Sequence, residues 1–187
     1  MKRIRLFLGI WLTADLQRKV TGCIRELSET SSGIRWTPPE QLHFTLKFLG
    51  EQPPEMPARL APELREVSAL HPAFDLKFGP GGVFPRHGEP RVLWLGLAEG
   101  QEPIAALAES VESACLKLGL PREDRVFRPH LTIGRVKASP AMFDRARLAA
   151  GISGRMTVDG FALIESVLSP GGPTYRELQR FKLGNRG

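Results

Sequence analysis

Two segments of the sequence each place a histidine two residues before a threonine, in HFTL at 43–46 and HLTI at 130–133. In QLHFTLKFLG, the apolar residues alternate with His43, Thr45 and Lys47. Alternation is typical of a half-buried strand, whose successive side chains point to opposite faces, so each histidine should share a face with its threonine. A histidine has an unperturbed pKa of about 6.5, and two of them can therefore provide the base and the acid of one reaction.

Such a set of side chains suits the cleavage of a phosphoester. One imidazole would take a proton from the attacking oxygen, and the other would give a proton to the leaving oxygen. Hydroxyls of Thr45 and Thr132 can donate hydrogen bonds to phosphate oxygens, and an arginine can neutralise their charge. The candidates are Arg135, at the end of the second histidine strand, and less directly Arg128, which shares a face with His130 in a regular strand. The residues alone leave open which histidine is the acid.

A metal site is the main alternative use of the two histidines. The spacing H-x-T supplies no second ligand, and neither His43 nor His130 has a carboxylate or a cysteine beside it. The remaining histidines, His71 and His87, lie in segments with Pro and Gly, and we assign them no role. The sequence also lacks a phosphate-binding loop, a dinucleotide fingerprint and a nucleophile elbow. We therefore expect neither a metal nor another cofactor.

The elements that must position these residues occur twice along the chain. His130 follows His43 by 87 positions (130 minus 43), and the same offset aligns LFLGI at 6–10 with LWLGL at 93–97. It also aligns two apolar pairs further along, Phe74 and Leu76 with Phe161 and Leu163. A repeat of chemistry-bearing residues together with their flanking strands favours a duplicated unit over two unrelated segments.

Each half is predicted to follow the order βαβαββ. Strands are expected near residues 4–11, 41–50, 73–79 and 82–86, and again near 91–98, 128–135, 156–168 and 174–183. Apolar residues at helical spacing predict helices near 14–29, 56–69 and 102–119. A short helix should follow the second histidine strand, capped by Ser139 with Pro140 in its first turn.

The predicted fold class is α+β, in one bilobal domain over residues 1–187. Its two halves, about 1–88 and 89–187, would be related by a pseudo-twofold axis, with antiparallel sheets flanking a central cleft and helices on the outside. No linker is long enough to separate independent domains. If the two histidine strands face each other across the axis, His43, Thr45, His130 and Thr132 line one cleft.

Composition agrees with a basic intracellular protein. The chain has 26 Lys and Arg against 20 Asp and Glu, a formal charge of +6, which favours polyanionic partners such as nucleic acid. The apolar run at 6–12 is at the short limit for a signal peptide, and a charged helix follows it without a convincing cleavage site. No run approaches the roughly 20 apolar residues of a membrane span. Cys23 and Cys115 lie in predicted helices and are expected to be buried thiols. We expect a cytoplasmic monomer without membrane contact.

The two H-x-T segments resemble the paired motifs of the two-histidine (2H) phosphoesterase superfamily. Their flanks, PPEQLHFTLKFLGE, GVFPRHGEPRVLWLGL and FRPHLTIGR, are similar to those of the bacterial RNA 2′,3′-cyclic phosphodiesterases, once called 2′-5′ RNA ligases. The resemblance extends to LIESVLSPGGPTYREL near the end of the chain. It implies a bilobal fold with a central cleft and metal-independent hydrolysis of a 2′,3′-cyclic phosphate to a 2′-phosphate.

The resemblance also assigns roles to the paired residues. His43 would be the proton donor to the departing 3′ oxygen, His130 would be the proton acceptor that activates water, and Thr45 and Thr132 would hold the phosphate. The partner would be RNA with a 2′,3′-cyclic phosphate end or a small cyclic nucleotide. Two alternatives stay open, which are ligation that forms a 2′-5′ bond and a non-catalytic module that binds RNA or nucleotides.

Overall fold

The computed structural model describes residues 3–170 and 172–185 and confirms the predicted α+β class. Its helices are α1 (Ala14–Glu29), α2 (Met56–Leu70), α3 (Gln101–Lys117) and α4 (Arg145–Ala150), with a short 3₁₀ helix η1 (Pro39–Gln41). Its strands are β1 (Ile4–Trp11), β2 (Ile34–Trp36), β3 (His43–Gln52), β4 (Phe74–Phe84), β5 (Val92–Glu99), β6 (Leu131–Val136), β7 (Arg155–Val158), β8 (Gly160–Ser169) and β9 (Gly172–Lys182).

β3, which begins at His43, and β6, which begins directly after His130, are neighbours at the centre of one antiparallel sheet. The order is β7-β4-β5-β6-β3-β1-β8-β9, with β2 also paired to β6. Phe44 of β3 pairs with Leu131 of β6, and these positions are related by the 87-residue offset. Outward from this pair, β1 and β8 follow β3 just as β5 and β4 follow β6. The pseudo-twofold axis therefore passes between Phe44 and Leu131.

β4 and β8 occupy equivalent positions near the ends of the two repeats, and each pairs with a strand of the other repeat. β4, from the first half, pairs with β5, whereas β8, from the second half, pairs with β1. Phe74 in β4 and Phe161 in β8 are again 87 residues apart. Each side of the sheet consequently contains strands from both halves of the chain, which interlocks the repeats.

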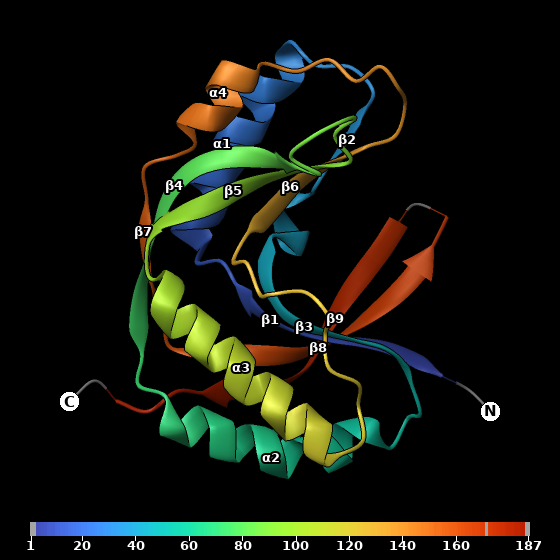
Figure 1. The fold of residues 1–187 in the computed structure, drawn as a ribbon, viewed down its shortest axis with the longest axis vertical. Coiled ribbons are helices and arrows are strands. Elements are labelled where there is room, and N and C mark those ends of the chain that lie inside the picture. Colours follow the sequence, from blue (N-terminus) through green and yellow to red (C-terminus); the bar gives the residue numbers. More distant parts are fainter. Residues whose placement is uncertain (1–2, 171, 186–187) are drawn as a thin grey trace.

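Helices pack against one face of the sheet and leave the opposite face to the histidines. Figure 1 shows α1 and α4 against the β4-β5-β6 side, and α2 and α3 against the β1-β3-β8 side. Alternate residues of the strands, such as Leu8, Phe44 and Leu131, are fully buried beneath these helices. Because side chains alternate, His43 and Thr45 lie on the other face. Among the residues that the structure describes, no helix has the length and apolar character to cross a bilayer.

The predicted alternation of β3 is wrong beyond Leu46. Leu8 and Gly9 are consecutive, but they pair with Lys47 and Thr45, so Leu46 is an extra residue in a β-bulge. The bulge exchanges the faces of the residues that follow. Lys47 is only 3% exposed and points into the core side, whereas Phe48 is 55% exposed.

Three further expectations differ from the structure. The strand expected near 156–168 is divided into β7 and β8, which pair with β4 and β1 respectively. The strands expected near 73–79 and 82–86 form the single strand β4, whose pairing with β5 shifts register between Phe78 and Gly81. The short helix expected at Ser139 is instead α4, whose first turn is capped by the Asp144 side chain accepting from the Arg147 amide at 2.8 Å. The amides of Lys137 and Ala138 both donate to the Gly33 carbonyl, so the chain after β6 stays bound to the segment before β2 and is not helical there.

Candidate active site

The two H-x-T segments meet at the centre of the sheet. Extending the register of Phe44 and Leu131 by one residue in each direction places His43 opposite Thr132 and Thr45 opposite His130. All four of these side chains lie on the face away from the helices, and all four are half-buried. The charge of a protonated His130 also lowers the pKa of His43, as expected for neighbouring rings. The structure therefore brings together the four residues that the repeat predicted to share a cleft.

Each imidazole is held by an equivalent hydrogen bond, from Nδ1 to the backbone carbonyl of the residue two positions earlier. Nδ1 of His43 lies 2.7 Å from the carbonyl oxygen of Gln41, and Nδ1 of His130 lies 2.7 Å from that of Arg128. A carbonyl oxygen only accepts, so each Nδ1 must carry a proton. In the neutral rings Nε2 is then the acceptor, and Nε2 of His43 lies 3.1 Å from the Thr45 hydroxyl, which can donate to it. Each histidine thus keeps Nε2 for proton transfer.

Burial makes both rings poor bases. It lowers the pKa of His43 from 6.5 to about 4, an effect opposed by the hydrogen bond to Gln41 and reinforced by the charges of Arg135 and His130. Burial also lowers the pKa of His130, against the hydrogen bond to Arg128 and with the charge of Arg135. Both imidazoles are therefore mostly neutral near neutral pH in the free enzyme.

Three aromatic rings enclose His43. Its ring centroid lies 4.8 Å from that of Phe7, 5.7 Å from that of Trp11 and 5.3 Å from that of Tyr175, the last in an edge-on arrangement. Trp11 is held in turn by its indole N–H, which donates to Glu177 at 2.8 Å. Sequence reasoning did not predict these residues. Phe7 carried a signal, since it aligns with Trp94 in the repeat, but Tyr175 comes from β9, a strand that pairs with β8.

A second aromatic pair supports His130. Phe84 lies edge-on to the His130 ring at 5.1 Å and stacks on Trp94 at 5.1 Å. Glycine at 82 is required here, because a Cβ would stand 2.6 Å from the Trp94 ring. The indole Nε1 of Trp94 is buried and has no hydrogen-bond partner among the described residues. The two histidines are therefore held by different aromatic neighbours in a site that is only approximately symmetric.

A second β-bulge turns Arg135 toward the histidines. Thr132 and Gly134 pair with consecutive residues of β5, so Ile133 is an extra residue in β6. Leu93, which pairs with Gly134, is fully buried in the core, and the next residue, Arg135, consequently faces the cleft. In a regular strand the third residue after Thr132 would point into the core. The charge of Arg135 lowers the pKa of both histidines.

The two bulges occupy equivalent positions in the repeat. Leu46 and Ile133 are 87 residues apart, as are Phe48 and Arg135. The same backbone irregularity thus presents an exposed phenylalanine on the side of His43 and an arginine on the side of His130. This difference places an additional positive charge at the end of the site where His130 lies.

The positive end includes Arg35 of β2, which pairs directly with Arg135. The guanidinium of Arg35 occupies the space that a side chain at Gly172 would need, at the start of β9. The same hairpin is tied to the segment before His43, since Gln41 donates from Nε2 to the Pro173 carbonyl at 2.6 Å. Contacts from the β8-β9 hairpin therefore reach both η1 and β2 at the rim of the cleft.

Arg128 contributes to the site through its backbone. Its carbonyl accepts the Nδ1 proton of His130, while its side chain is exposed. Residue 128 precedes β6, which begins at Leu131, so the alternation of a regular strand does not determine where the guanidinium lies.

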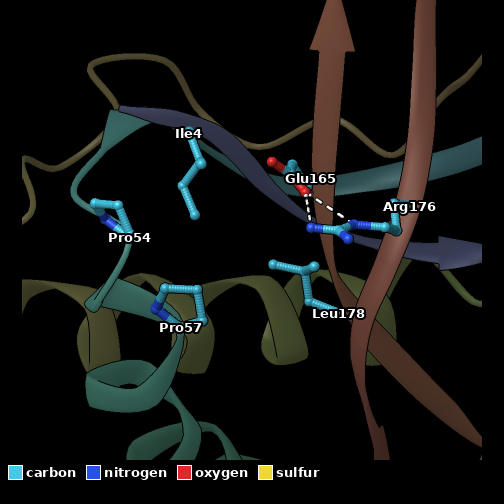
Figure 2. Close-up of a pocket in the computed structure, with 6 residues that line it drawn as sticks. All are labelled: Ile4, Pro54, Pro57, Glu165, Arg176 and Leu178. Atoms are coloured by element: carbon cyan, nitrogen blue, oxygen red, sulfur yellow. Dashed lines mark hydrogen bonds and ion pairs between the residues drawn. The ribbon is translucent and has the colours of Figure 1, made fainter. Parts of the chain in front are cut away.

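The pocket in Figure 2 lies on the helix-covered face of the sheet, opposite the histidines, since Pro57 of α2 is one of its walls. Its lining residues are Ile4, Pro54, Pro57, Glu165, Arg176 and Leu178. Arg176 donates to Glu165 at 2.6 and 3.0 Å, so the two charged groups satisfy each other. Within residues 3–170 and 172–185, no three His, Cys, Asp or Glu side chains are grouped so that they could hold a metal ion. The candidate active site is the face of the sheet where the two H-x-T segments meet, because the register of β3 and β6 brings both histidines and both threonines together there.

Comparisons with known proteins agree with this geometry. The sequence matches the model of the 2′-5′ RNA ligase superfamily over residues 15–169. An RNA 2′,3′-cyclic phosphodiesterase of Archaeoglobus fulgidus is 41% identical over 181 residues, 96% of this chain and 100% of that one. The crystal structure of TT0787 of Thermus thermophilus has a TM-score of 0.83 at 30% identity, covering 98% of this chain and 100% of that one.

A structure of E. coli LigT complexed with 3′-AMP has a TM-score of 0.81 at 26% identity, covering 97% of this chain and 99% of that one. The family match includes both H-x-T segments, and the relatives are aligned over nearly the whole chain. The resemblance that the motifs indicated is thereby confirmed. The chain belongs to the 2′-5′ RNA ligase superfamily.

Proposed function

We propose that this chain hydrolyses the 2′,3′-cyclic phosphate of RNA ends or of small cyclic nucleotides to a 2′-phosphate. One observation carries the proposal, which is that the two histidines at the starts of neighbouring strands make equivalent Nδ1 hydrogen bonds to backbone carbonyls and keep Nε2 for proton transfer at one site. The relative from Archaeoglobus fulgidus, named an RNA 2′,3′-cyclic phosphodiesterase, supports the substrate class. The formal charge of +6 suits a polyanionic substrate.

In the proposed reaction, His130 and His43 act on opposite sides of phosphorus. Neutral His130 takes a proton from water through Nε2 while the water oxygen bonds to phosphorus. The bond from phosphorus to the 3′ oxygen breaks, and that oxygen receives the Nε2 proton of protonated His43. The product carries a 2′-phosphate and a free 3′ hydroxyl, and proton exchange with solvent restores the two rings. The family resemblance supports this order of acid and base.

The remaining polar groups of the cleft hold the phosphate in this proposal. Thr45 and Thr132 donate hydrogen bonds to the non-bridging oxygens, and Arg135 neutralises the charge that develops on them. Arg128 is a less direct candidate, because the contact described for it is through its carbonyl. No step requires a metal, since two imidazoles move the protons and a guanidinium provides the positive charge.

The acid role of His43 requires the substrate to raise its pKa. With a pKa of about 4, His43 is almost entirely neutral at pH 7 in the free enzyme. A phosphodiester carries a negative charge, which favours the protonated imidazole and raises the pKa when the substrate is bound. The anionic substrate thus helps to load the proton that its own leaving oxygen later receives.

The lowered pKa values predict how the two kinetic constants depend on pH. Productive enzyme contains protonated His43, which is lost as pH rises, and neutral His130, which is lost as pH falls. Because both pKa values are lowered in the free enzyme, we expect a bell-shaped kcat/KM with its optimum below pH 6.5. The optimum of kcat should lie at higher pH, because bound phosphate raises both values. Initial rates on a nucleoside 2′,3′-cyclic phosphate across this range test the expectation, and a kcat/KM optimum on the alkaline side of neutrality would contradict it.

The decisive experiment is turnover of a nucleoside 2′,3′-cyclic phosphate in metal-free buffer that contains a chelator. We expect the 2′-phosphate as product, identified by ³¹P NMR, at the same rate with and without the chelator. Tight binding without turnover would favour a non-catalytic nucleotide-binding module instead. Inhibition by the chelator would favour a metal site, and formation of 2′-5′ bonds from two RNA ends would favour ligation, which the same residues serve in reverse.

The proposal also describes a monomer that works in the cytoplasm. Cys23 and Cys115 are both buried and unpaired, which fits the reducing environment of that compartment. Light scattering of the purified protein tests the oligomeric state, and a stable dimer would contradict this part of the proposal.

A further inference from the structure

A buried ion pair lies directly beneath the histidine cleft. Lys47 follows Thr45 by two residues, and the bulge at Leu46 turns its side chain to the core side. There its ammonium lies 2.6 Å from Oε1 of Glu112 on α3. Lys47 is 3% exposed and Glu112 is 8% exposed, so both charges have left water. Burying two charges is costly unless further hydrogen bonds satisfy them. The other hydrogen-bond partners of Lys47 and Glu112 therefore show which part of the chain the pair contacts.

Both of those further partners belong to the segment that leads to His130. The Lys47 ammonium also donates to the carbonyl of Pro121 at 2.8 Å, and Glu112 accepts from the backbone amide of Glu123 at 3.2 Å. Pro121 and Glu123 lie between the end of α3 and the start of β6. Figure 1 shows the chain rising from the end of α3 toward β6 along this path. The ion pair thus binds the beginning of the segment at two points.

This segment has no regular structure of its own. Residues 120–130 lie outside helices and strands, and most of their side chains are exposed. The segment nevertheless includes the Arg128 carbonyl that orients the His130 ring. The matching carbonyl for His43 belongs to Gln41, which is the last residue of η1 and is tied by its own side chain to Pro173. The first histidine is therefore oriented by a short helix, whereas the second depends on an irregular segment.

The repeat emphasises this difference. The position equivalent to Lys47 in the second histidine strand is Gly134, which has no side chain to make such contacts. Only one of the two H-x-T strands consequently carries the buried cation. It reaches from the strand of His43 to the segment of His130, and so it connects the two halves of the site.

We propose that Lys47 and Glu112 are positioning residues for the reaction, which hold the segment 118–130 so that the Arg128 carbonyl keeps His130 in the orientation that proton transfer requires. The inference rests on the proposed function for its catalytic consequence. Its structural content, that the pair orients His130, stands without it. A displacement of about 1 Å at a reacting group can cost about 10²-fold in rate, so two anchors in the segment are enough to matter.

The test must separate positioning from a general loss of stability. Lys47→Met alone leaves Glu112 charged and unpaired in the core, which is strongly destabilising. The double variant Lys47→Met/Glu112→Leu replaces the pair by apolar side chains of similar size, an exchange that is often neutral for stability. It still removes both hydrogen bonds to the segment, because neither new side chain is a donor to Pro121 or an acceptor from Glu123. We expect a melting temperature within a few degrees of wild type.

In this double variant we expect kcat on a nucleoside 2′,3′-cyclic phosphate to fall about 10- to 100-fold with little change in KM. NMR titration of the imidazoles should show the pKa of His130 moving back toward 6.5, because a looser segment exposes the ring, while His43 keeps its lowered value. Amide exchange in residues 118–130 should become faster. A purely structural pair would change none of these once stability is restored.

The matched control is Lys117→Met/Glu63→Leu, which removes an ion pair at the end of the same helix that reaches α2 instead of the segment. It should leave kcat and the His130 titration at wild-type values. Wild-type kcat and an unchanged His130 titration in the Lys47→Met/Glu112→Leu variant would overturn the positioning role. If the wild-type protein itself shows no turnover, the proposed function fails, whereas the titration and the amide exchange still decide whether the pair orients His130.

Discussion

Replacing His130 or His43 with asparagine is expected to lower kcat on a nucleoside 2′,3′-cyclic phosphate by about 10²- to 10⁴-fold, the usual contribution of a general acid or base. Asparagine is preferable to alanine, because its side-chain N–H can still donate to the carbonyl that each Nδ1 now uses, at Arg128 or Gln41. The ring nitrogen Nε2 and its titration are lost in both variants. The measurement is steady-state kinetics together with the melting temperature, which should stay close to that of wild type.

The two variants should also reveal which histidine is the acid. When the leaving group of a phosphodiester is 4-nitrophenolate, that group departs without taking up a proton. The loss of a general acid therefore slows the cleavage of such a substrate less. We expect His43→Asn to lose much less activity on that substrate than on the cyclic phosphate, while His130→Asn loses about the same on both. The reverse pattern would exchange the roles, and normal turnover by either variant would remove that histidine from the mechanism.

The sequence was sufficient for the chemistry-bearing residues and the class of fold. Two H-x-T segments at one offset predicted a duplicated unit, and the structure places Phe44 and Leu131, the residues between each histidine and threonine, as cross-strand partners on the axis. The helix at 14–29 is found with those bounds, because its apolar stripe has the period of a helix and all five of its members are buried: Leu16, Val20, Cys23, Ile24 and Leu27.

The pairing of strands between the two repeats could not be predicted from the sequence. Alternation shows that β4 and β8 are strands, but it carries no information on their partners, which are distant in the chain. The structure pairs β4 with β5 and β8 with β1, so each repeat completes the sheet of the other. The enclosure of His43 depends on this exchange, because Tyr175 lies on β9, the strand that follows β8 in the sheet.

The bulges correct the side-chain directions that strict alternation gives for β3 and β6. A regular strand would put Lys47 on the same face as His43 and Thr45, and it would direct Arg135 into the core. The extra residues Leu46 and Ile133 reverse both outcomes, since a bulge lets one residue of the partner strand oppose two. A bulge leaves no periodic signal in a short strand. The buried lysine and the charge of the cleft therefore emerge only from the pairing register.

Arg135 is the residue for which this correction has the largest functional consequence. Replacing it with alanine is expected to lower kcat/KM on a nucleoside 2′,3′-cyclic phosphate by about 10²- to 10³-fold, the loss typical of one preorganised donor to a developing negative charge. Arg135→Lys should recover part of the activity, because it restores the charge without the planar pair of donors. Lys137→Ala is the matched control, since it removes an equal charge two residues later, where the side chain is exposed and lies beyond β6.

The pH profile separates a role at the reacting phosphate from a role in holding RNA. The charge of Arg135 lowers the pKa of both histidines, so its removal should raise both values and move the whole kcat/KM profile to higher pH. Lys137→Ala should leave the profile in place. For an oligonucleotide, each lost contact with an RNA phosphate reduces the slope of log K against log salt by about 0.7, whereas a mononucleotide substrate should respond little to salt. If Arg135→Ala hydrolyses the mononucleotide normally, with an unshifted profile and a reduced salt slope for the oligonucleotide, Arg135 binds the RNA backbone, and the catalytic groups reduce to the two histidines and two threonines.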